Sequence, residues 1–208
     1  MKMVIADKNY STWSLRAWLC AKQSGIAFEE VLIRLNTAQT KSEIFKYSPS
    51  GKLPCLIDGD TLVWDSLAIC EYFAEKKPSL WPKDRKDRGE ARSIAAEIHS
   101  GFLSMRQDMP MKISSSRPYN VRSPDAESNI SRIIAILESC LARFSQKGPF
   151  LFGDFTIVDA MFAPVVWRFL TYDVKTPEAT QAWIETMLAL PAMQEWKEGA
   201  LLEAGEED

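Results

Sequence analysis

The sequence SPSGKLPCLIDGDTLVWDS, residues 48–66, specifies a turn, two strands and the start of a helix within nineteen residues. Asp58-Gly59 lies between two apolar runs, which is a strong short-range signal for a β-hairpin. Pro54 has no amide hydrogen and can begin the first strand of that hairpin. Asp65-Ser66 supplies side-chain oxygens directly before the apolar-periodic residues 67–73, as is typical of a helix N-terminus. The stretch therefore predicts an antiparallel hairpin that leads into a helix.

The same stretch has the features of a binding site for an extended peptide. Leu53, just before Pro54, can offer its backbone amide and carbonyl to an extended ligand. The helix that begins at Asp65-Ser66 presents backbone amides and the positive end of its dipole to a carboxylate. We therefore expect an extended, carboxylate-bearing ligand to lie along these residues.

Periodicity before and after this stretch predicts an α/β domain. The expected elements are a strand at 2–6, a helix at 14–24, a strand at 28–33, a short helix at 41–47, and then the hairpin with its helix. The order β-α-β-α-β-β-α is typical of a thioredoxin-like domain. Because Lys77-Pro78 must end the last helix, we predict a first domain at 1–78 and a polar linker at 79–87.

The remainder of the chain, residues 88–208, is predicted to form an all-helical bundle domain. Strand signals are absent from it, and apolar residues recur at helical spacing in two groups: Ile94, Ile98, Phe102 and Met105, then Ile130, Ile133, Ile134, Leu137, Leu141 and Phe144. A loop is expected from Ser114 to Pro124, and Pro177 and Pro191 are expected to begin shorter helices. The acidic residues 203–208 are expected to be frayed.

One helix of this second domain is apolar on nearly every face and is therefore expected to be central and buried. It follows Thr156-x-x-Asp159, a pattern that predicts an N-terminal capping arrangement. Loss of this arrangement is expected to cost about 1 to 2 kcal/mol, so Asp159 is interpreted as a folding element. Pro164 is expected to interrupt or kink the helix.

Composition excludes several functional classes. The net charge is −3 and the sequence pI is near 5.4, with Lys and Arg interspersed among Asp and Glu, so we expect no nucleic-acid partner. Residues 1–7 lose apolar character too early for a signal peptide, and no apolar run approaches about 18 residues, so we expect a cytoplasmic protein with no membrane partner. The chain has four cysteines, at positions 20, 55, 70 and 140, and no two of them form a C-x-x-C motif. We therefore expect buried free thiols and no metal site.

Residues 48–73 closely resemble the glutathione-binding half of the cytosolic glutathione transferase family. The resemblance implies a thioredoxin-like fold, a homodimer, and glutathione as the co-substrate. It also implies that the bond between Leu53 and Pro54 is cis, that Leu53 pairs with the cysteinyl backbone of glutathione, and that Asp65 and Ser66 hold its γ-glutamyl end. Lys52 or Lys41 can reach the glycyl carboxylate.

The segment Ser11-Thr12-Trp13-Ser14-Leu15-Arg16 lies where the first strand gives way to the first helix, a position that favours anions such as a thiolate. Lowering a thiol pKa from about 8.5 by about two units requires about 2.7 kcal/mol. A hydroxyl donor to charged sulfur supplies about 1.5 to 3 kcal/mol and a helix end about 0.5 to 1 kcal/mol. Together these two contributions suffice without a general base.

That segment resembles the S-S-C-S-x-x-R pattern of serine-type transferases, including the zeta class, but is one residue tighter before the Arg; we read the family's spacing as S-S-C-S-W-R. Aligned on Ser14 and Arg16, the resemblance implies that Ser11 is the catalytic hydroxyl, with Tyr10, Thr12 and Ser14 as alternatives. A helix cap is the competing role for the Ser11 oxygen. The absence of Cys at position 11 argues against glutaredoxin-like chemistry, and Trp13 stands where zeta-class members carry Cys, a departure from the pattern of the maleylacetoacetate isomerases.

The resemblance also implies that the second substrate, a small hydrophobic electrophile, lies against the helical domain. Trp13, His99 and Arg106 are the predicted contacts, with His99 and Arg106 on one long helix; a packed His is the competing interpretation. The leading hypothesis is conjugation of glutathione to that electrophile. Glutathione-dependent isomerisation or dehalogenation is an alternative, and a non-catalytic binding protein on the same fold is another.

Overall fold

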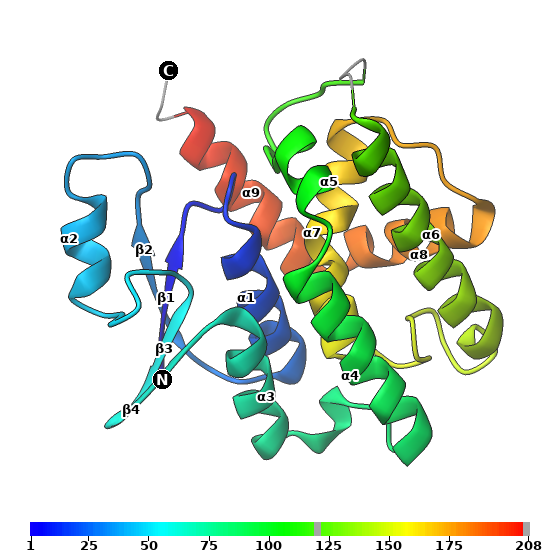
Figure 1. Ribbon diagram of the computed structural model, residues 1–208. Helices are drawn as coiled ribbons and strands as arrows, with labels where there is room; N and C mark the ends of the chain where they lie inside the picture. Colours follow the sequence, from blue (N-terminus) through cyan, green and yellow to red (C-terminus); the bar gives the residue numbers. More distant parts are fainter. Residues whose placement is uncertain (119–121, 206–208) are drawn as a thin grey trace.

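The computed structural model describes residues 1–118 and 122–205 (Figure 1). Its first part has the predicted order β-α-β-α-β-β-α. The elements are β1 (Lys2–Ala6), α1 (Thr12–Ser24), β2 (Glu29–Ile33), α2 (Thr40–Phe45), β3 (Cys55–Asp58), β4 (Thr61–Trp64) and α3 (Ser66–Lys76). The predicted thioredoxin-like arrangement is confirmed.

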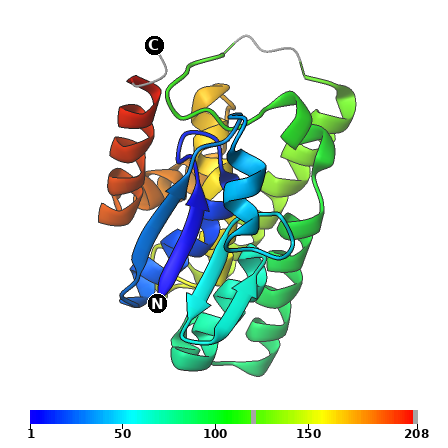
Figure 2. The same cartoon turned by 90° about the vertical axis from the view of Figure 1, so that its left-hand side faces the viewer.

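The four strands form one mixed sheet in the order β2-β1-β3-β4 (Figure 2). β1 runs parallel to β2, and β3 is antiparallel to both β1 and β4. Asp58 pairs with Thr61 across the hairpin, and Gly59 adopts a positive φ of 60° in the turn between them. The pairing of β3 with β4 confirms the hairpin predicted from Asp58-Gly59. Glycine suits the turn because it adopts this backbone conformation at little steric cost.

The second part is helical. It comprises η1 (Pro78–Leu80), α4 (Arg85–Ser100), α5 (Leu103–Asp108), α6 (Pro124–Phe144), α7 (Ile157–Thr171), α8 (Glu178–Ala189) and α9 (Pro191–Gly205). The expected linker at 79–87 contains the end of η1 and the first residues of α4; the domain boundaries themselves stay predictions. Of the expected loop at 114–124, residues 119–121 lie outside the described part of the chain.

His99 and Arg106 do not share one helix, so that expectation is wrong. α4 ends at Ser100 and α5 begins at Leu103. A Cβ on Gly101 would lie 2.8 Å from the Glu97 carbonyl oxygen, and Phe102 has a left-handed φ of 63°. Phe102 stays buried across this break, which explains why the apolar spacing alone suggested a continuous helix.

Helix α7 lies at the centre of the helical part, as predicted, and its capping box of Thr156 and Asp159 is present. The Asp159 carboxylate also accepts hydrogen bonds from the Leu151 amide at 3.0 Å and from Trp183 Nε1 at 3.1 Å. Burial raises the pKa of Asp159, and these donors partly offset that rise. Pro164 lies inside α7 without ending it, so the expected interruption is absent.

One cluster of buried apolar side chains joins the sheet to the helical part. Met3 and Ile5 of β1 belong to it together with side chains of α1, α3, α4, α6, α7, α8 and α9, whereas Val4 faces the smaller cluster under α2. This division follows the alternation of side chains along a strand. The buried Arg16 side chain of α1 crosses the same boundary by donating to the Met161 and Ile98 carbonyls at 3.0 and 3.2 Å.

Two further predictions concern the thiols and the C-terminal end. All four cysteines are buried and free of disulfides, as expected. The expected fraying of residues 203–208 is wrong for Glu203, which is buried in α9; residues 206–208 lie outside the described part. Among the described helices, none has the length and apolar character needed to cross a membrane.

Candidate functional site

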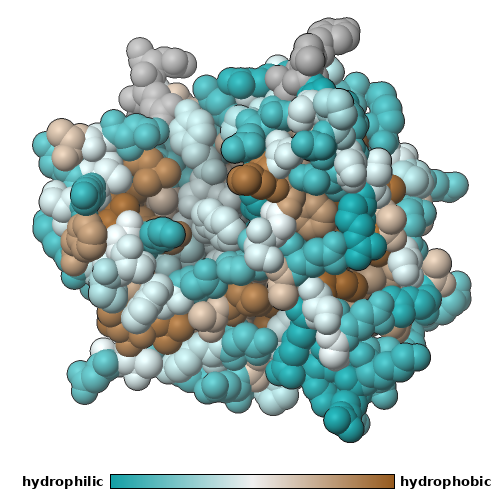
Figure 3. Space-filling model, viewed as in Figure 1, coloured by the Kyte–Doolittle hydropathy of each residue, from teal (hydrophilic) through white to brown (hydrophobic). Residues whose placement is uncertain are grey.

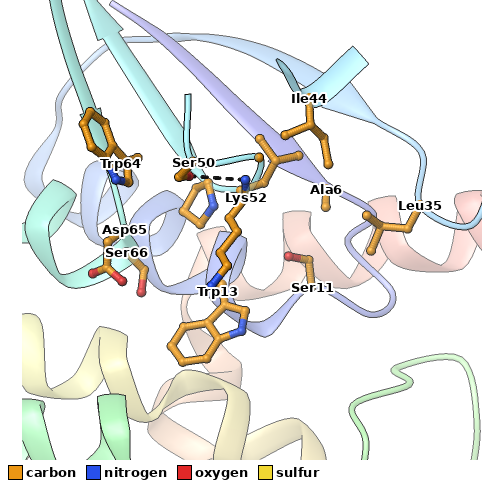
Figure 4. Close-up of a pocket in the computed structure, with 13 residues that line it drawn as sticks. Ala6, Ser11, Trp13, Leu35, Ile44, Ser50, Lys52, Trp64, Asp65 and Ser66 are labelled. Atoms are coloured by element: carbon orange, nitrogen blue, oxygen red, sulfur yellow. Dashed lines mark hydrogen bonds between the residues drawn. The ribbon is translucent and has the colours of Figure 1, made fainter. Parts of the chain in front are cut away.

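A cavity of about 740 Å³ lies at the carboxyl end of β1, where the start of α1, the start of α3 and residues 50–54 converge. The surface in this region is hollowed between the sheet side and the helical side of the molecule (Figure 3). Ser11 lies on one side of the cavity, Asp65 and Ser66 lie on the other, and Lys52 lies between them (Figure 4). The lining residues are Ala6, Ser11, Trp13, Leu35, Ile44, Ser50, Gly51, Lys52, Leu53, Pro54, Trp64, Asp65 and Ser66.

The start of α3 supplies a carboxylate and a buried hydroxyl to this cavity. Asp65 is the N-cap of α3, with Oδ1 accepting from the Leu67 and Ala68 amides at 2.9 and 3.3 Å. Its φ of 76° is uncommon for a non-glycine residue. Ser66 is only 1% exposed, and its Oγ has no hydrogen-bond partner among the described residues. Buried hydroxyls are nearly always paired with protein, water or a bound molecule, so Ser66 Oγ is available to pair with a molecule in this cavity.

His99 lies against the other oxygen of the same carboxylate. Its Nε2 is 3.1 Å from Asp65 Oδ2, and its Nδ1 is buried without a partner among the described residues. Burial raises the pKa of Asp65. The hydrogen bond and charge of His99 and the two amide hydrogen bonds lower it by more than burial raises it, so the pKa of Asp65 lies below its usual value. The structure thus brings His99 to Asp65; its contact with an electrophile stays a prediction.

The lowered pKa of Asp65 predicts how stability depends on pH. A carboxyl whose pKa is lower in the folded state stabilises the fold above its unfolded pKa, and this contribution is lost as pH falls through the folded value. We expect the free energies of unfolding of the wild type and Asp65→Asn to converge as pH falls from about 5 to about 2. Urea unfolding at a series of pH values measures this, and a gap that stays constant to the lowest pH would contradict it.

Ser11 is the one hydroxyl of the four candidates that lines the cavity among the described residues. It is the N-cap of α1, and its Oγ accepts from the Ser14 amide at 3.3 Å and donates to Ser14 Oγ at 2.8 Å. Ser14 Oγ is fully buried and accepts from the Ala6 amide at 3.0 Å. Ser11 therefore both caps α1 and faces the cavity. Ser14, which is buried, forms a hydrogen bond with the Ser11 hydroxyl.

Trp13 forms the floor of the cavity in the view of Figure 4, and 37% of its surface is exposed. The guanidinium groups of Arg16 and Arg106 lie 4.6 and 5.1 Å from the centre of its ring. The His99 ring meets it edge-on at 5.2 Å. The three predicted substrate contacts, Trp13, His99 and Arg106, are thus neighbours, but only Trp13 lines the cavity.

Arg106 is held by the backbone of the break between α4 and α5. Its Nε donates to the Gly101 carbonyl at 3.0 Å and its Nη2 donates to the Ile98 carbonyl. Burial lowers the pKa of Arg106, and burial together with the neighbouring Arg106 and Arg168 charges lowers that of Arg16. Arg16 Nη1 is buried without a partner among the described residues.

The strand that enters the hairpin supplies the remaining predicted residues. The peptide bond between Leu53 and Pro54 is cis, as the resemblance implied, and Lys52, Leu53 and Pro54 all line the cavity. The Lys52 side chain extends toward Trp13 (Figure 4). Lys41 of α2 is exposed and is absent from the cavity lining.

Several lining residues were not anticipated from the sequence. Trp64 is 45% exposed at the end of β4, directly before Asp65, and its place in the hairpin could have indicated it. Gly51 has a φ of 67°, and a Cβ there would lie 2.8 Å from the Phe45 ring. Leu35, in the loop after β2, and Ile44, in α2, also line the cavity; their places depend on tertiary packing, for which no local sequence signal exists. Within the described residues, no three His, Cys, Asp or Glu side chains form a metal-binding group.

Two family models match the chain. The model described as "Glutathione S-transferase, N-terminal domain" matches residues 10–76. The model described as "Glutathione S-transferase, C-terminal domain" matches residues 105–197. Together they span most of the chain and include every sequence-predicted site residue except His99.

Individual relatives carry different names. The chain is 26% identical over 186 residues to a probable maleylacetoacetate isomerase of Caenorhabditis elegans, covering 87% of this chain and 85% of that protein. It is 25% identical over 167 residues to a stringent starvation protein A homolog of Haemophilus ducreyi, covering 79% and 73%. The fold is similar, with a TM-score of 0.73, to that of a Burkholderia glutathione transferase homolog with bound glutathione, at 21% identity and covering 96% and 97%.

Proposed function

The chain belongs to the glutathione S-transferase family, and from this premise we propose that its cavity binds glutathione and that Ser11 activates the thiol for attack on a small hydrophobic electrophile. The observation that carries the proposal is the unpaired, buried Ser66 hydroxyl beside the Asp65 carboxylate at the start of α3. The bound glutathione of the Burkholderia homolog is consistent with it.

The start of α3 is suited to the γ-glutamyl end of glutathione, which carries both an ammonium and a carboxylate. The ionised Asp65 side chain can pair with the ammonium, since His99 and the α3 amides keep its pKa low. Ser66 Oγ can donate to the carboxylate, which the positive end of the α3 dipole also favours. Leu53 then lies where the cysteinyl backbone passes, and Lys52 lies within reach of the cavity for the glycyl carboxylate.

Ser11 supports a thiolate through a rearrangement of two hydroxyl protons. In the structure the Ser11 proton points to Ser14 Oγ. When sulfur occupies the cavity, the Ser11 proton can turn to it while Ser14 donates its own proton to Ser11, because Ser14 Oγ is already held by the Ala6 amide. The thiol proton leaves to solvent, and the sulfur electron pair forms the new bond to an electrophilic carbon. Either a leaving group departs from that carbon with its bonding electron pair, or, in an addition, the pair of a carbon multiple bond moves to the neighbouring atom, which then takes a proton from solvent.

Isomerisation is the second candidate activity, favoured by the similarity to a probable maleylacetoacetate isomerase. In that reaction the thiolate adds to the substrate and leaves again, so glutathione is not consumed. Measuring glutathione loss per product formed therefore separates isomerisation from conjugation. A non-catalytic binding role on the same fold stays a further alternative. The homodimer and the cytoplasmic location stay proposals.

The first test is calorimetric titration with glutathione of the wild type, Asp65→Ala and Ser66→Ala. We expect Asp65→Ala to weaken binding by about 10- to 100-fold and Ser66→Ala by about 10-fold, because each removes a hydrogen bond to a charged group. Asp58→Ala is the matched control: Asp58 lies in the hairpin that precedes Asp65 but outside the cavity lining, and it pairs with Lys76 at 2.7 Å and Tyr72 at 2.8 Å. Absence of glutathione binding to the wild type would refute the proposed function, and equal effects of Asp65→Ala and Asp58→Ala would refute the assigned site.

A further inference from the structure

The last helix of the chain holds the loop that carries Ser11. Glu203 of α9 is 5% exposed, and its Oε2 accepts from the Lys8 amide at 2.6 Å and from the Asn9 amide at 3.3 Å. Trp196, earlier in α9, donates from Nε1 to the Lys8 carbonyl at 2.9 Å. Figure 1 shows α9 beside α1 and the loop after β1. Both the amide and the carbonyl of Lys8 are therefore held by side chains of α9.

The same loop is connected to Ser11 by its own backbone and to the helical part by Asn9. The Asp7 carbonyl accepts from the Ser11 amide at 2.8 Å. Asn9 is fully buried, and it exchanges two hydrogen bonds of 3.0 Å with Ser114, one with its hydroxyl and one with its amide. A displacement of Lys8 or Asn9 would therefore move the backbone from which Ser11 projects.

Glu203 shares its surroundings with a second buried carboxylate. Arg34 Nη1 lies 3.1 Å from Asp7 Oδ1 and 3.7 Å from Glu203 Oε2. Asp7 also accepts from the amide of Leu35, which lines the cavity, at 2.5 Å. Burial raises the pKa of Glu203, and the Asn9 and Lys8 amides and Arg34 offset part of that rise. Burying a carboxylate costs free energy unless it is paired, and two of the partners that Glu203 has here are amides of the loop.

We propose that Glu203 is a positioning residue, which fixes Lys8 and Asn9 so that the Ser11 hydroxyl faces the cavity in the orientation needed to activate a thiol. The proposal rests on the proposed function for its catalytic part. Glu203 lines no part of the cavity, so any effect on a bound thiol must pass through the residues that Glu203 contacts. The proposed role of Glu203 predicts an effect on the activation of bound glutathione and little effect on the affinity for glutathione.

The test compares Glu203→Ala with Glu195→Ala, a matched control on the same helix. Glu195 pairs with Lys22 of α1 at 2.7 Å, so its loss also removes a contact between α9 and α1 but leaves the loop untouched. Glu203→Gln is the conservative variant, because its amide oxygen can still accept from the loop. Three quantities are measured: amide hydrogen exchange over residues 7–14 without ligand, the dissociation constant of glutathione, and the pKa of its bound thiol from thiolate absorbance.

We expect Glu203→Ala to speed exchange over residues 7–14 by about 10-fold or more and to raise the bound thiol pKa by about one unit, which corresponds to about 10-fold less thiolate. The glutathione dissociation constant should change less than about 2-fold, Glu203→Gln should recover part of both effects, and Glu195→Ala should match the wild type. Unchanged exchange, or faster exchange with an unchanged thiol pKa, would overturn the proposal. If the wild type binds no glutathione, the proposed function fails, but hydrogen exchange at the Ser11 amide still decides whether Glu203 holds the loop. If Glu203→Ala does not fold, Glu203→Gln is used for the same comparison.

Discussion

Replacing Ser11 with alanine is expected to lower the turnover of glutathione by about 10- to 100-fold, because a hydrogen bond to a charged sulfur contributes about 1.5 to 3 kcal/mol. Glutathione itself should still bind within about 3-fold of the wild-type affinity, since Asp65 and Ser66, at the other end of the cavity, are proposed to bind its γ-glutamyl end. Steady-state kinetics with a chromogenic electrophile measures turnover, and calorimetry measures binding. The bound thiol pKa should rise in parallel.

The capping role of Ser11 makes a control essential. Ser123 is the N-cap of α6, accepts from the Ala126 amide at 3.3 Å, and lies outside the cavity lining. Both Ser11→Ala and Ser123→Ala should cost about 1 kcal/mol of stability, but only Ser11→Ala should impair turnover. If Ser11→Ala retained full turnover while losing the expected stability, Ser11 would be a cap alone. Ser14→Ala would then become the next variant to measure, because Ser14 Oγ contacts Ser11 directly.

Replacing Asp159 with alanine is expected to destabilise the fold by about 4 kcal/mol or more, well above the cost of a lost helix cap. Its carboxylate accepts from the Thr156 amide and hydroxyl, and also from the Leu151 amide and Trp183 Nε1. Truncation leaves these donors buried without a partner, and each unpaired buried donor costs about 1 to 3 kcal/mol. Urea-induced unfolding followed by circular dichroism measures the change.

Asp84→Ala provides the comparison for that measurement. Asp84 is the N-cap of α4 and accepts from the Lys86 and Asp87 amides at 2.8 and 3.0 Å, but it lies at the surface. Water can satisfy those amides after truncation, so the expected cost is about 1 kcal/mol. Equal destabilisation by Asp159→Ala and Asp84→Ala would show that the bonds to Leu151 and Trp183 contribute little.

Local chemistry made much of the fold predictable. Asp58-Gly59 specified the hairpin because glycine accepts the turn conformation, and Asp65-Ser66 specified the start of α3 because its oxygens pair with the first amides of the helix. The alternation of strand and helix patterns predicted the order of elements up to α3. Apolar spacing did not reveal the break at Gly101, because Ile98 before it and Phe102 and Met105 after it are all buried, as they would be on one continuous helix.

The candidate site was predictable where it is local in sequence and unpredictable where it is assembled by packing. Ser11, residues 52–54 and Asp65-Ser66 all line one cavity, as their motifs suggested. The approach of His99 to Asp65 depends on how α4 packs against α3, and the contact of Glu203 with Lys8 joins residues 195 positions apart. No short-range pattern encodes such contacts, since they depend on the whole tertiary arrangement.

The single apolar cluster that runs from β1 through α7 to α9 has a consequence for how the chain folds. A segment ending near residue 76 would expose the faces of α1 and α3 that pack on the helices, and the remaining segment would lose the surface that covers α7. Each half would leave part of this apolar cluster exposed to water, so we expect the two units recognised in the sequence to depend on each other for folding. The protein should melt in one cooperative transition, and the two halves should reach a native state only when they are joined or mixed.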